Sequence, residues 1–397
     1  MKIDLKSRNV TRPPFNGATL FALRNTQSID LSLLAAETNL PLEQLRRFEQ
    51  GEAEPTPKQA EILAKKLGVS QYLFYRSKTP DFDDRALDFR RHDDSSLISP
   101  AGARAIESVR SRLRYAAKFL DLSQTVVPLE RSPEADGETV RRALKLSTEI
   151  QLSFETQKDL FRYIRHQIEE LGILTFSVSA PTSDFRGFAI QELSRWAVGF
   201  NSKEWSWGAR SFTLVHELVH VFIGTPGLSD PFRPSNSDER FCNKVASLAL
   251  APARLLLRLA EQNPRSQRDE VAYVKYAANK LNISLHMTAI RLEEEKLVDE
   301  GFAESWLAKV KASGKHPDQA TQGGSAGPTA QDEGKTKISH FGSLLPQLID
   351  KAIRDKKLHR NDSLKLFGLK YKYLSDSVSA AQERAAEQSE RASAYDS

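Results

Sequence analysis

The residues best suited to chemistry lie in one short run, HELVH, at positions 216–220. His216 and His220 are four residues apart, so on a helix both imidazoles face the same side and can bind one metal ion. Zn²⁺ accepts such nitrogen ligands, and Glu217 stands where it can hold and deprotonate a water molecule next to the ion. Phe, Leu, Val and Ile surround the run, which predicts a buried helix whose polar groups converge on one point.

This pattern is the HExxH signature of zinc peptidases. The competing interpretation is a core helix whose two histidines are satisfied by ordinary hydrogen bonds. A zinc site needs a third ligand, and Glu239 is the candidate because it opens a second helical stretch, ERFCNKVASLALAP. Asp230, Asp238 and the more distant His286 are rival ligands. A glutamate at the start of a helix also has a simpler explanation, since it interacts favourably with the helix dipole.

Cys242 is the only cysteine of the chain, and it follows Glu239 by three residues. A thiolate ligand or a redox sensor is one interpretation. Its place in an apolar helical stretch favours packing instead. A single cysteine also excludes an internal disulfide framework and fits a reducing cytosol.

The composition is that of a soluble globular protein. At 397 residues the chain is long enough for two or three domains with separate cores. It contains no run of 18 apolar residues, and its first residues lack the apolar core of a secretory signal, so we expect no membrane span and a cytoplasmic location. The net charge of +5 permits nucleic-acid binding without arguing for it.

The first eighty residues read as a bundle of short helices. Helices are predicted at about 18–26, 31–39, 42–51 and 57–68, with Asp30 as an N-cap. The run LSLLAAETNLPLEQLRRFEQGEAEPTPKQAEILAKKLGVS resembles an Xre/Cro-type helix-turn-helix domain, in which the third helix enters the major groove.

That resemblance implies a set of double-stranded DNA contacts on the third helix. The residues implied to face bases are Leu42, Glu43, Gln44 and Arg47, and Arg46 is implied to meet phosphates. Several glutamates make this surface less basic than a strong DNA reader would need. A helical dimerisation or protein-binding module is therefore the alternative, and a homodimer stays open.

The middle of the chain is predicted to change from helix to strand. Residues 77–94 form an extended connector, and helical patterns follow at 100–122 and 138–171, with a polar break at 132–137.

After Gly172 the period becomes that of β-structure. Strands are predicted at 173–179, 186–192 and 195–201, joined by short turns and feeding the HELVH helix. An edge strand of such a sheet can pair with an extended substrate backbone and lay a peptide bond over the metal.

Residues 172–300 resemble the ImmA/IrrE family of zinc metallopeptidases. The matching blocks are GILTFSVS, RGFAI, GARSFTLVHELVH and ERFCNKVASLALAP. The resemblance implies that His216, His220 and Glu239 hold Zn²⁺ and that Glu217 is the general base. It also implies a protein substrate, typically a DNA-binding repressor in stress response or mobile-element control. Val219 is a departure, since many members have a small residue there.

The last part of the chain is predicted to be accessory. Residues 306–337 are a flexible linker, 338–378 a small helical unit, and 379–397 a disordered tail. The helical unit is interpreted as a packing or dimerisation element, with a second nucleic-acid contact as the alternative. Its basic residues are Lys351, Arg354, Lys356, Lys357 and Arg360.

The sequence thus predicts an α+β, mostly helical protein with a helix-turn-helix domain at 1–80 and a zincin-like domain, containing a three-stranded sheet, at 81–305. Its expected function is that of a DNA-binding regulator with a zinc-dependent endopeptidase domain. The alternatives are a transcription factor whose peptidase-like domain senses a ligand without cleaving, and a toxin–antitoxin or phage-defence component.

Overall fold

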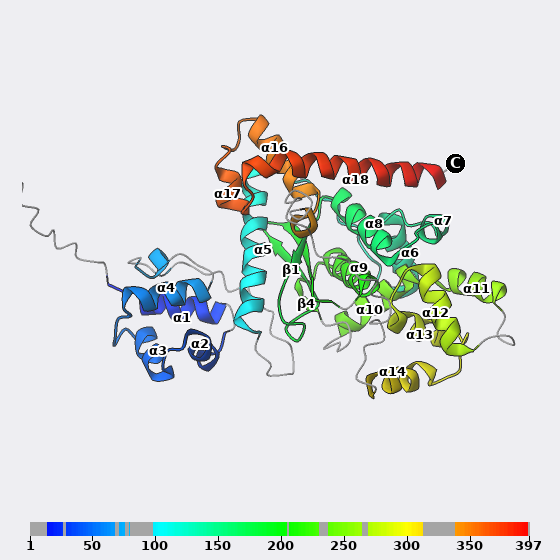
Figure 1. Ribbon diagram of the computed structural model, residues 1–397, viewed down its shortest axis with the longest axis horizontal. Coiled ribbons are helices and arrows are strands. Elements are labelled where there is room, and N and C mark those ends of the chain that lie inside the picture. The colour runs from blue at the N-terminus through cyan, green and yellow to red at the C-terminus, as the bar shows by residue number, and fades with distance from the viewer. Residues whose placement is uncertain are drawn as a thin grey trace, which may run out of the picture. The chain divides into compact units, whose positions relative to one another are not determined.

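A computed structural model shows a mostly helical chain with one small sheet (Figure 1). It describes residues 14–26, 29–67, 71–75, 79, 98–204, 206–229, 237–263, 269–312 and 338–395. Two compact units divide the chain, residues 1–108 and 109–397, and the boundary falls within helix α5 (Pro100–Phe119). The expected boundary at residue 80 lies just where the described part of the chain is interrupted, and the connector at 77–94 is almost entirely outside it.

The first unit is the predicted bundle of short helices. Its elements are α1 (Gly17–Thr26), α2 (Leu31–Thr38), α3 (Leu42–Glu49), α4 (Pro57–Lys66) and the 3-10 helix η1 (Gln71–Tyr75). The side chain of Asp30 accepts a hydrogen bond from the Ser32 amide, so the predicted N-cap of α2 is confirmed. Leu34, Leu45 and Phe48 are fully buried and pack the helices around one core.

A buried ion pair fixes α3 within this unit. The Arg24 guanidinium on α1 binds the Glu49 carboxylate at the end of α3, with Nε and Oε1 2.6 Å apart, and both side chains are largely buried. The same guanidinium donates to the Ile29 carbonyl. Because α3 is held at its last residue, its first turns keep a defined direction while their outer face stays exposed.

The prediction of one helical stretch at 138–171 was wrong. The structure has three helices there, α6 (Pro133–Ala143), α7 (Thr148–Leu152) and α8 (Gln157–Glu170). Ser147 and Thr156 break the run, because each side-chain hydroxyl accepts a backbone N–H and so starts a new helix. The polar break expected at 132–137 is instead the beginning of α6.

A four-stranded sheet of order β1-β3-β2-β4 is the only β-structure in the described ranges. The strands are β1 (Leu174–Val178), β2 (Gly187–Glu192), β3 (Arg195–Asn201) and β4 (Gly227–Ser229). The three predicted strands are present, and β4 adds a fourth in a segment expected to be a loop. β1 pairs with β3 in parallel, whereas β2 is antiparallel to both β3 and β4.

The sheet stands between α5 and the helices α8 and α9 (Trp207–Ile223) (Figure 1). On the α5 side, Arg110 and Arg114 both pair with Glu192 at the end of β2, at 3.1 and 3.2 Å. On the other side, apolar residues of β3, α8 and α9 form the main core. Further helices complete this unit: α10 (Ser237–Leu250), α11 (Ala253–Gln262), α12 (Glu270–Leu281), α13 (Leu285–Glu294) and α14 (Phe302–Ala312).

Two predictions for the end of the chain need correction. The linker was expected from 306, but α14 continues to Ala312, because Trp306 stacks on Phe302 and packs against the core. The rest of the linker, 313–337, lies outside the described residues. The tail expected to be disordered from 379 continues helix α18 (Leu374–Tyr395), since its Ala, Glu, Gln and Arg residues are strong helix formers and Ala381 is fully buried.

The C-terminal helices belong to the second unit. They comprise α16 (Leu344–Arg354), α17 (Asp362–Phe367), the 3-10 helix η5 (Tyr371–Tyr373) and α18. The buried carboxylate of Glu169 on α8 accepts the Ser343 amide at 2.7 Å, and Arg165 donates to the Ser339 carbonyl at 2.8 Å. These contacts attach the C-terminal helices to α8 beside β1.

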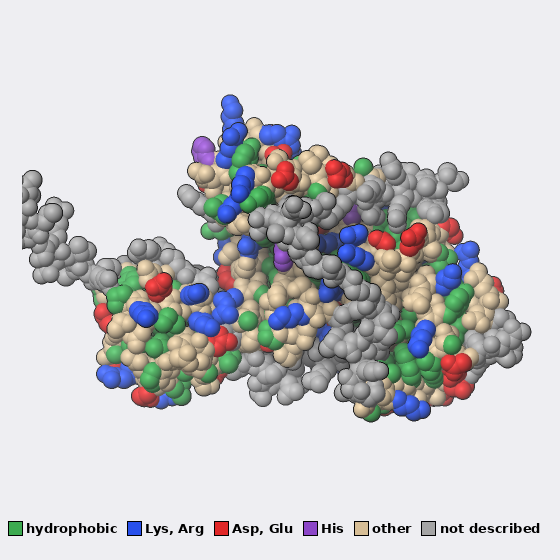
Figure 2. Space-filling model, viewed as in Figure 1, with side chains coloured by type: hydrophobic (Ala, Val, Ile, Leu, Met, Phe, Trp, Pro, Cys, Tyr) green, Lys and Arg blue, Asp and Glu red, His purple; other side chains and the backbone are tan. Residues whose placement is uncertain are grey.

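Lys and Arg side chains are visible over α16 and α17 (Figure 2). Three of the five basic residues named above already have partners within the fold. Lys351 pairs with Asp121 at 3.2 Å, Arg354 pairs with Asp350 at 2.9 Å, and Arg360 lies over the Tyr371 ring. Among the helices that the structure describes, none is long and apolar enough to cross a membrane.

Candidate metal centre

Helix α9 carries both histidines, and its ends are defined by local interactions. The Ser206 hydroxyl caps its beginning by accepting the Ala209 amide, and Gly224 ends it in the left-handed conformation, with φ of 73°. Thirteen of its 17 residues are buried, so the helix lies in the core, as the sequence predicts. His216 and Glu217 are fully buried, and His220 is 3% exposed.

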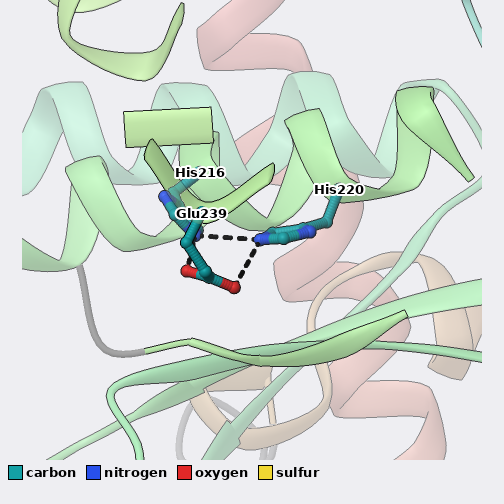
Figure 3. A group of neighbouring side chains, drawn as sticks. All are labelled: His216, His220 and Glu239. Atoms are coloured by element: carbon teal, nitrogen blue, oxygen red, sulfur yellow. Dashed lines mark hydrogen bonds and ion pairs between the residues drawn. The ribbon is translucent and has the colours of Figure 1, made fainter. Parts of the chain in front are cut away.

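The structure brings His216, His220 and Glu239 together (Figure 3). The two histidine Nε2 atoms are 3.0 Å apart. The Glu239 carboxylate on α10 faces both, with Oε2 3.2 Å from His216 Nε2 and Oε1 3.2 Å from His220 Nε2. In a tetrahedral zinc site with bonds of about 2 Å, ligand atoms lie about 3.3 Å from one another. The observed separations are of this size, with one carboxylate oxygen of Glu239 facing each histidine.

The hydrogen bonding of His220 supports metal binding. Its Nδ1 atom is 3.1 Å from the Thr225 hydroxyl, which follows the end of α9. When Nδ1 carries the proton and donates it to this hydroxyl, the Nε2 lone pair points at Glu239 and His216. Two imidazole lone pairs and a carboxylate then share one buried point, and a cation is the group that satisfies all three.

Thr225 is a positioning residue that the sequence analysis missed. We expect Thr225→Val to weaken zinc binding about tenfold, because the hydroxyl that orients His220 is lost while the backbone hydrogen bond from Thr225 to the His220 carbonyl remains. Competition with a chromophoric chelator measures this. Thr139→Val on α6 is the matched control, since that hydroxyl donates to a backbone carbonyl of its own helix. Equal zinc affinity of the two variants would contradict the role of Thr225.

Burial and hydrogen bonding set the charge states at this centre. Burial lowers the pKa of His216, and its interaction with the Glu239 carboxylate acts against that effect. Burial alone would raise the pKa of Glu239, but its hydrogen bonds with His216 and His220 outweigh burial and hold this pKa at about 2. A neutral imidazole and an ionised carboxylate are the forms that bind zinc.

The lowered pKa of Glu239 predicts a pH dependence of the metal-free protein. A carboxyl group whose pKa falls on folding stabilises the fold above its ordinary value of 4.5, and this contribution is lost as the pH falls toward 2. The melting temperature of the wild type should therefore exceed that of Glu239→Gln at pH 5. The margin should shrink below pH 4.5. A margin that grows as the pH falls below 4.5 would contradict the assignment.

The two rival ligands that the structure describes, Asp238 and His286, do not join this group. Asp238 pairs with Arg131 at 2.7 Å, His286 lies on α13, and Asp230 is outside the described residues. Among the described residues, the one group able to offer three ligand atoms within 4.8 Å is the one in Figure 3. Cys242 is fully buried, and burial raises the pKa of its thiol, so it stays protonated and packs in the core.

Strand β2 passes directly over Glu217. A Cβ atom placed on Gly187, the first residue of β2, would lie 2.5 Å from Glu217 Oε1 and 2.5 Å from Thr213 Cγ2. The absence of a side chain at Gly187 therefore leaves the space that the Glu217 carboxylate occupies. The sequence predicts that Gly187 lies in a strand. It does not predict the contact with Glu217, because that contact joins segments far apart in the chain.

The candidate DNA-contacting residues lie at the start and along the outer face of α3. Leu42, Glu43, Arg46 and Arg47 are exposed, and Gln44 is half-buried. Arg46 pairs with Glu43, with Nη1 and Oε2 2.8 Å apart, and Arg47 Nε lies 3.9 Å from Glu52 Oε2. Exposed pairs of this kind are weak, so neither one prevents an arginine from binding a phosphate or a base.

Comparisons with known proteins agree with both units. The family model described as the IrrE N-terminal-like domain matches residues 168–293, from the end of α8 to α13, and includes the three ligands and Glu217. The family model described as helix-turn-helix matches residues 20–70. Comparison with curated proteins and with solved structures gave no match.

Proposed function

We propose that this protein is a DNA-binding regulator whose second domain hydrolyses a peptide bond in a protein partner. The chain joins an Xre-type helix-turn-helix domain to an ImmA/IrrE-type domain. The observation that carries the proposal is the meeting of two histidine nitrogens and a carboxylate at separations of 3.0 to 3.2 Å, next to a buried glutamate on the helix that carries the histidines. The resemblance to the ImmA/IrrE family implies a DNA-binding repressor as the partner.

The roles of the residues follow from their positions. His216, His220 and Glu239 hold Zn²⁺, which when bound supplies a Lewis acid that polarises the substrate carbonyl and makes water more acidic. Glu217 takes the proton of the attacking water on its carboxylate and passes it to the nitrogen of the leaving amine. Because Glu217 is fully buried beneath β2, bulk water does not compete for that proton.

The sheet contributes the surface for the substrate chain. β4 pairs with only the first three residues of β2, at Gly187, Phe188 and Ala189. Beyond these three residues, β2 pairs with β3 alone in the described part of the chain. An extended polypeptide would add a strand along this side of β2 or along the outer edge of β4.

Mapping of new protein N-termini tests the hydrolytic function. Cells that produce the wild-type chain should contain at least one cleaved protein that is absent from cells producing Glu217→Gln. The wild type and Glu217→Gln differ only in one buried side-chain group. Their abundance in the cell and their DNA binding should therefore be equal, and both serve as internal controls. Identical sets of N-termini, with both proteins loaded with zinc, would favour a domain that senses a partner without cleaving it.

DNA binding by α3 is tested with two arginine variants. We expect Arg47→Ala to weaken binding to a selected target sequence by about fivefold to a hundredfold and to reduce discrimination against mismatched sites. Arg46→Ala should weaken binding to all DNA sequences alike and lower the salt dependence of binding. Fluorescence anisotropy over a series of salt concentrations measures both. Unchanged affinity of Arg47→Ala at every salt concentration would exclude the proposed groove contact.

A further inference from the structure

A strongly basic stretch of the chain forms part of the C-terminal helices. From Lys351 to Tyr373 the sequence has eight Lys or Arg residues and two acidic residues, Asp355 and Asp362. Eight positive charges against two negative ones give this stretch a charge of +6, which exceeds the +5 of the whole chain. Figure 2 shows Lys and Arg side chains grouped over α16 and α17. The proposed function assigns no role to them.

The inner face of these helices is fixed to the second unit. Ile349 on α16 and Phe367 on α17 are fully buried. Arg112 Nε on α5 donates to the Phe367 carbonyl at 3.1 Å, and the Glu169 carboxylate on α8 accepts the Ser343 amide just before α16. Because packing uses the inner face, the basic side chains of the outer face are presented to solvent from a fixed backbone.

A hollow of about 640 Å³ opens between the end of α16 and the start of α17. Lys356 and Arg360 at this hollow are exposed. The nearby carboxylate of Asp362 accepts the His359 amide at 2.9 Å. Cationic and amide donors without a competing carboxylate in the lining suit a phosphate group. The residues that line the hollow are Ile353, Lys356, Leu358, His359, Arg360 and Asn361.

Tyr371 continues this surface beyond the hollow. The Arg360 guanidinium lies 4.7 Å from the centroid of the Tyr371 ring, and the tyrosine is 37% exposed. Lys370 and Lys372 flank it in the chain, and both are exposed. A guanidinium stacked on a ring keeps N–H donors at its edge for a phosphate, and tyrosine hydroxyls also bind phosphate oxygens.

The other unit of the chain indicates which polyanion this surface binds. Residues 20–70 match the helix-turn-helix model, so duplex DNA is the nucleic acid expected at the first unit. A second contact on the same chain then meets that DNA at a high effective concentration. Exposed Lys and Arg side chains that bind phosphates do so without regard to base sequence.

We propose that the outer face of α16, α17 and η5 binds the phosphate backbone of duplex DNA, independently of base sequence. The proposal rests on DNA binding by the first unit, which is part of the proposed function. It gives the second unit a DNA contact of its own, outside the sequence that α3 reads. We call this face the C-terminal basic surface, and it consists of Lys356, Arg360, Lys370, Tyr371 and Lys372.

The test removes three charges from this surface in the full chain. The surface variant combines Lys356→Gln, Arg360→Gln and Lys370→Gln, all at exposed positions. Its affinity for a duplex with the selected target sequence and long flanks should fall at least about fivefold. The slope of log affinity against log salt concentration should become less steep by about 3, about one for each cation removed. Fluorescence anisotropy measures both.

A matched control removes three charges elsewhere in the second unit. Lys275 and Lys280 on α12 and Lys309 on α14 are exposed and lie outside the basic stretch. The control variant, with all three changed to glutamine, has the same net charge as the surface variant and should bind DNA like the wild type. Equal melting temperatures of the three proteins show that the fold is unchanged.

Footprinting with hydroxyl radicals locates the second contact. The wild type should protect backbone positions in the flanks as well as in the target sequence. The surface variant should protect the target sequence alone. Single-stranded RNA and phosphatidylserine vesicles are the competing polyanions. The affinity lost by the surface variant should be larger for duplex DNA than for either of them.

The outcomes separate this proposal from DNA binding by the first unit. The basic surface is overturned, while binding by α3 stands, if the surface variant keeps the salt dependence and footprint of the wild type or if the control variant loses as much affinity. A larger loss for RNA or for vesicles overturns duplex DNA as the ligand. A wild type that binds no duplex at any salt concentration overturns DNA binding by both units.

Discussion

Replacement of Glu217 by glutamine should abolish proteolysis while the protein keeps its zinc. Glutamine has nearly the same shape as glutamate, so the fully buried position remains filled and the three ligands are untouched. It cannot accept a proton from water at neutral pH. We therefore expect the rate of cleavage to fall by about a hundredfold to ten-thousandfold, which is the usual contribution of a general base.

The matched control is Glu239→Gln, a substitution of the same chemical kind at a candidate ligand. Glu239→Gln should lose both zinc and cleavage, because a neutral amide replaces the carboxylate that faces both histidines. Metal analysis of the purified proteins and cleavage of a mapped substrate measure the two effects. If Glu217→Gln cleaves as fast as the wild type, Glu217 is not the base. If Glu239→Gln retains full zinc, the third ligand is a different residue.

Addition of a single methyl group at Gly187 should reduce cleavage by about a hundredfold. The new Cβ atom of Gly187→Ala would lie 2.5 Å from Glu217 Oε1, so either the carboxylate or strand β2 must move. A displacement of about 1 Å in a catalytic group is enough for a loss of this size. The zinc content should stay near that of the wild type, because the methyl group does not contact the three ligands.

The same sheet offers a control for this substitution. Gly227 on β4 pairs with Ala189 of β2, and a Cβ atom placed on it meets no atom within 4 Å. Gly227→Ala adds the same methyl group to the sheet without reaching Glu217, so it should keep far more cleavage activity than Gly187→Ala. Melting temperatures of both variants separate a loss of catalysis from a loss of folding. Full activity of a folded Gly187→Ala would show that the position of Glu217 does not depend on β2.

Much of the local structure could be predicted because it depends on residues close together in the chain. Asp30 caps α2 through an amide two residues away, and the apolar run with β-branched and aromatic residues at 195–201 corresponds to the observed strand β3. The prediction of one helical stretch at 138–171 was wrong for a related reason. Its amphipathic pattern is nearly continuous, and two hydroxyl caps, at Ser147 and Thr156, nevertheless divide it into three helices.

Pairing between distant segments could not be predicted from the sequence in the same way. β4 has three residues, too few to show an alternating period, and it becomes a strand only because β2 offers free backbone groups beside it. The parallel pairing of β1 with β3 also skips the strand between them in the chain. Neither feature is encoded in a local pattern.

The candidate metal centre likewise has a part that the sequence predicts and a part that it does not. The sequence by itself determined that His216 and His220 share one face of a buried helix, because a spacing of four residues is a property of the helix itself. Only the tertiary structure decided that Glu239 rather than Asp238 faces them, that Thr225 orients His220, and that Gly187 leaves room for Glu217. Those relations depend on how α9, α10 and β2 pack, and packing is determined by the whole core rather than by any one segment.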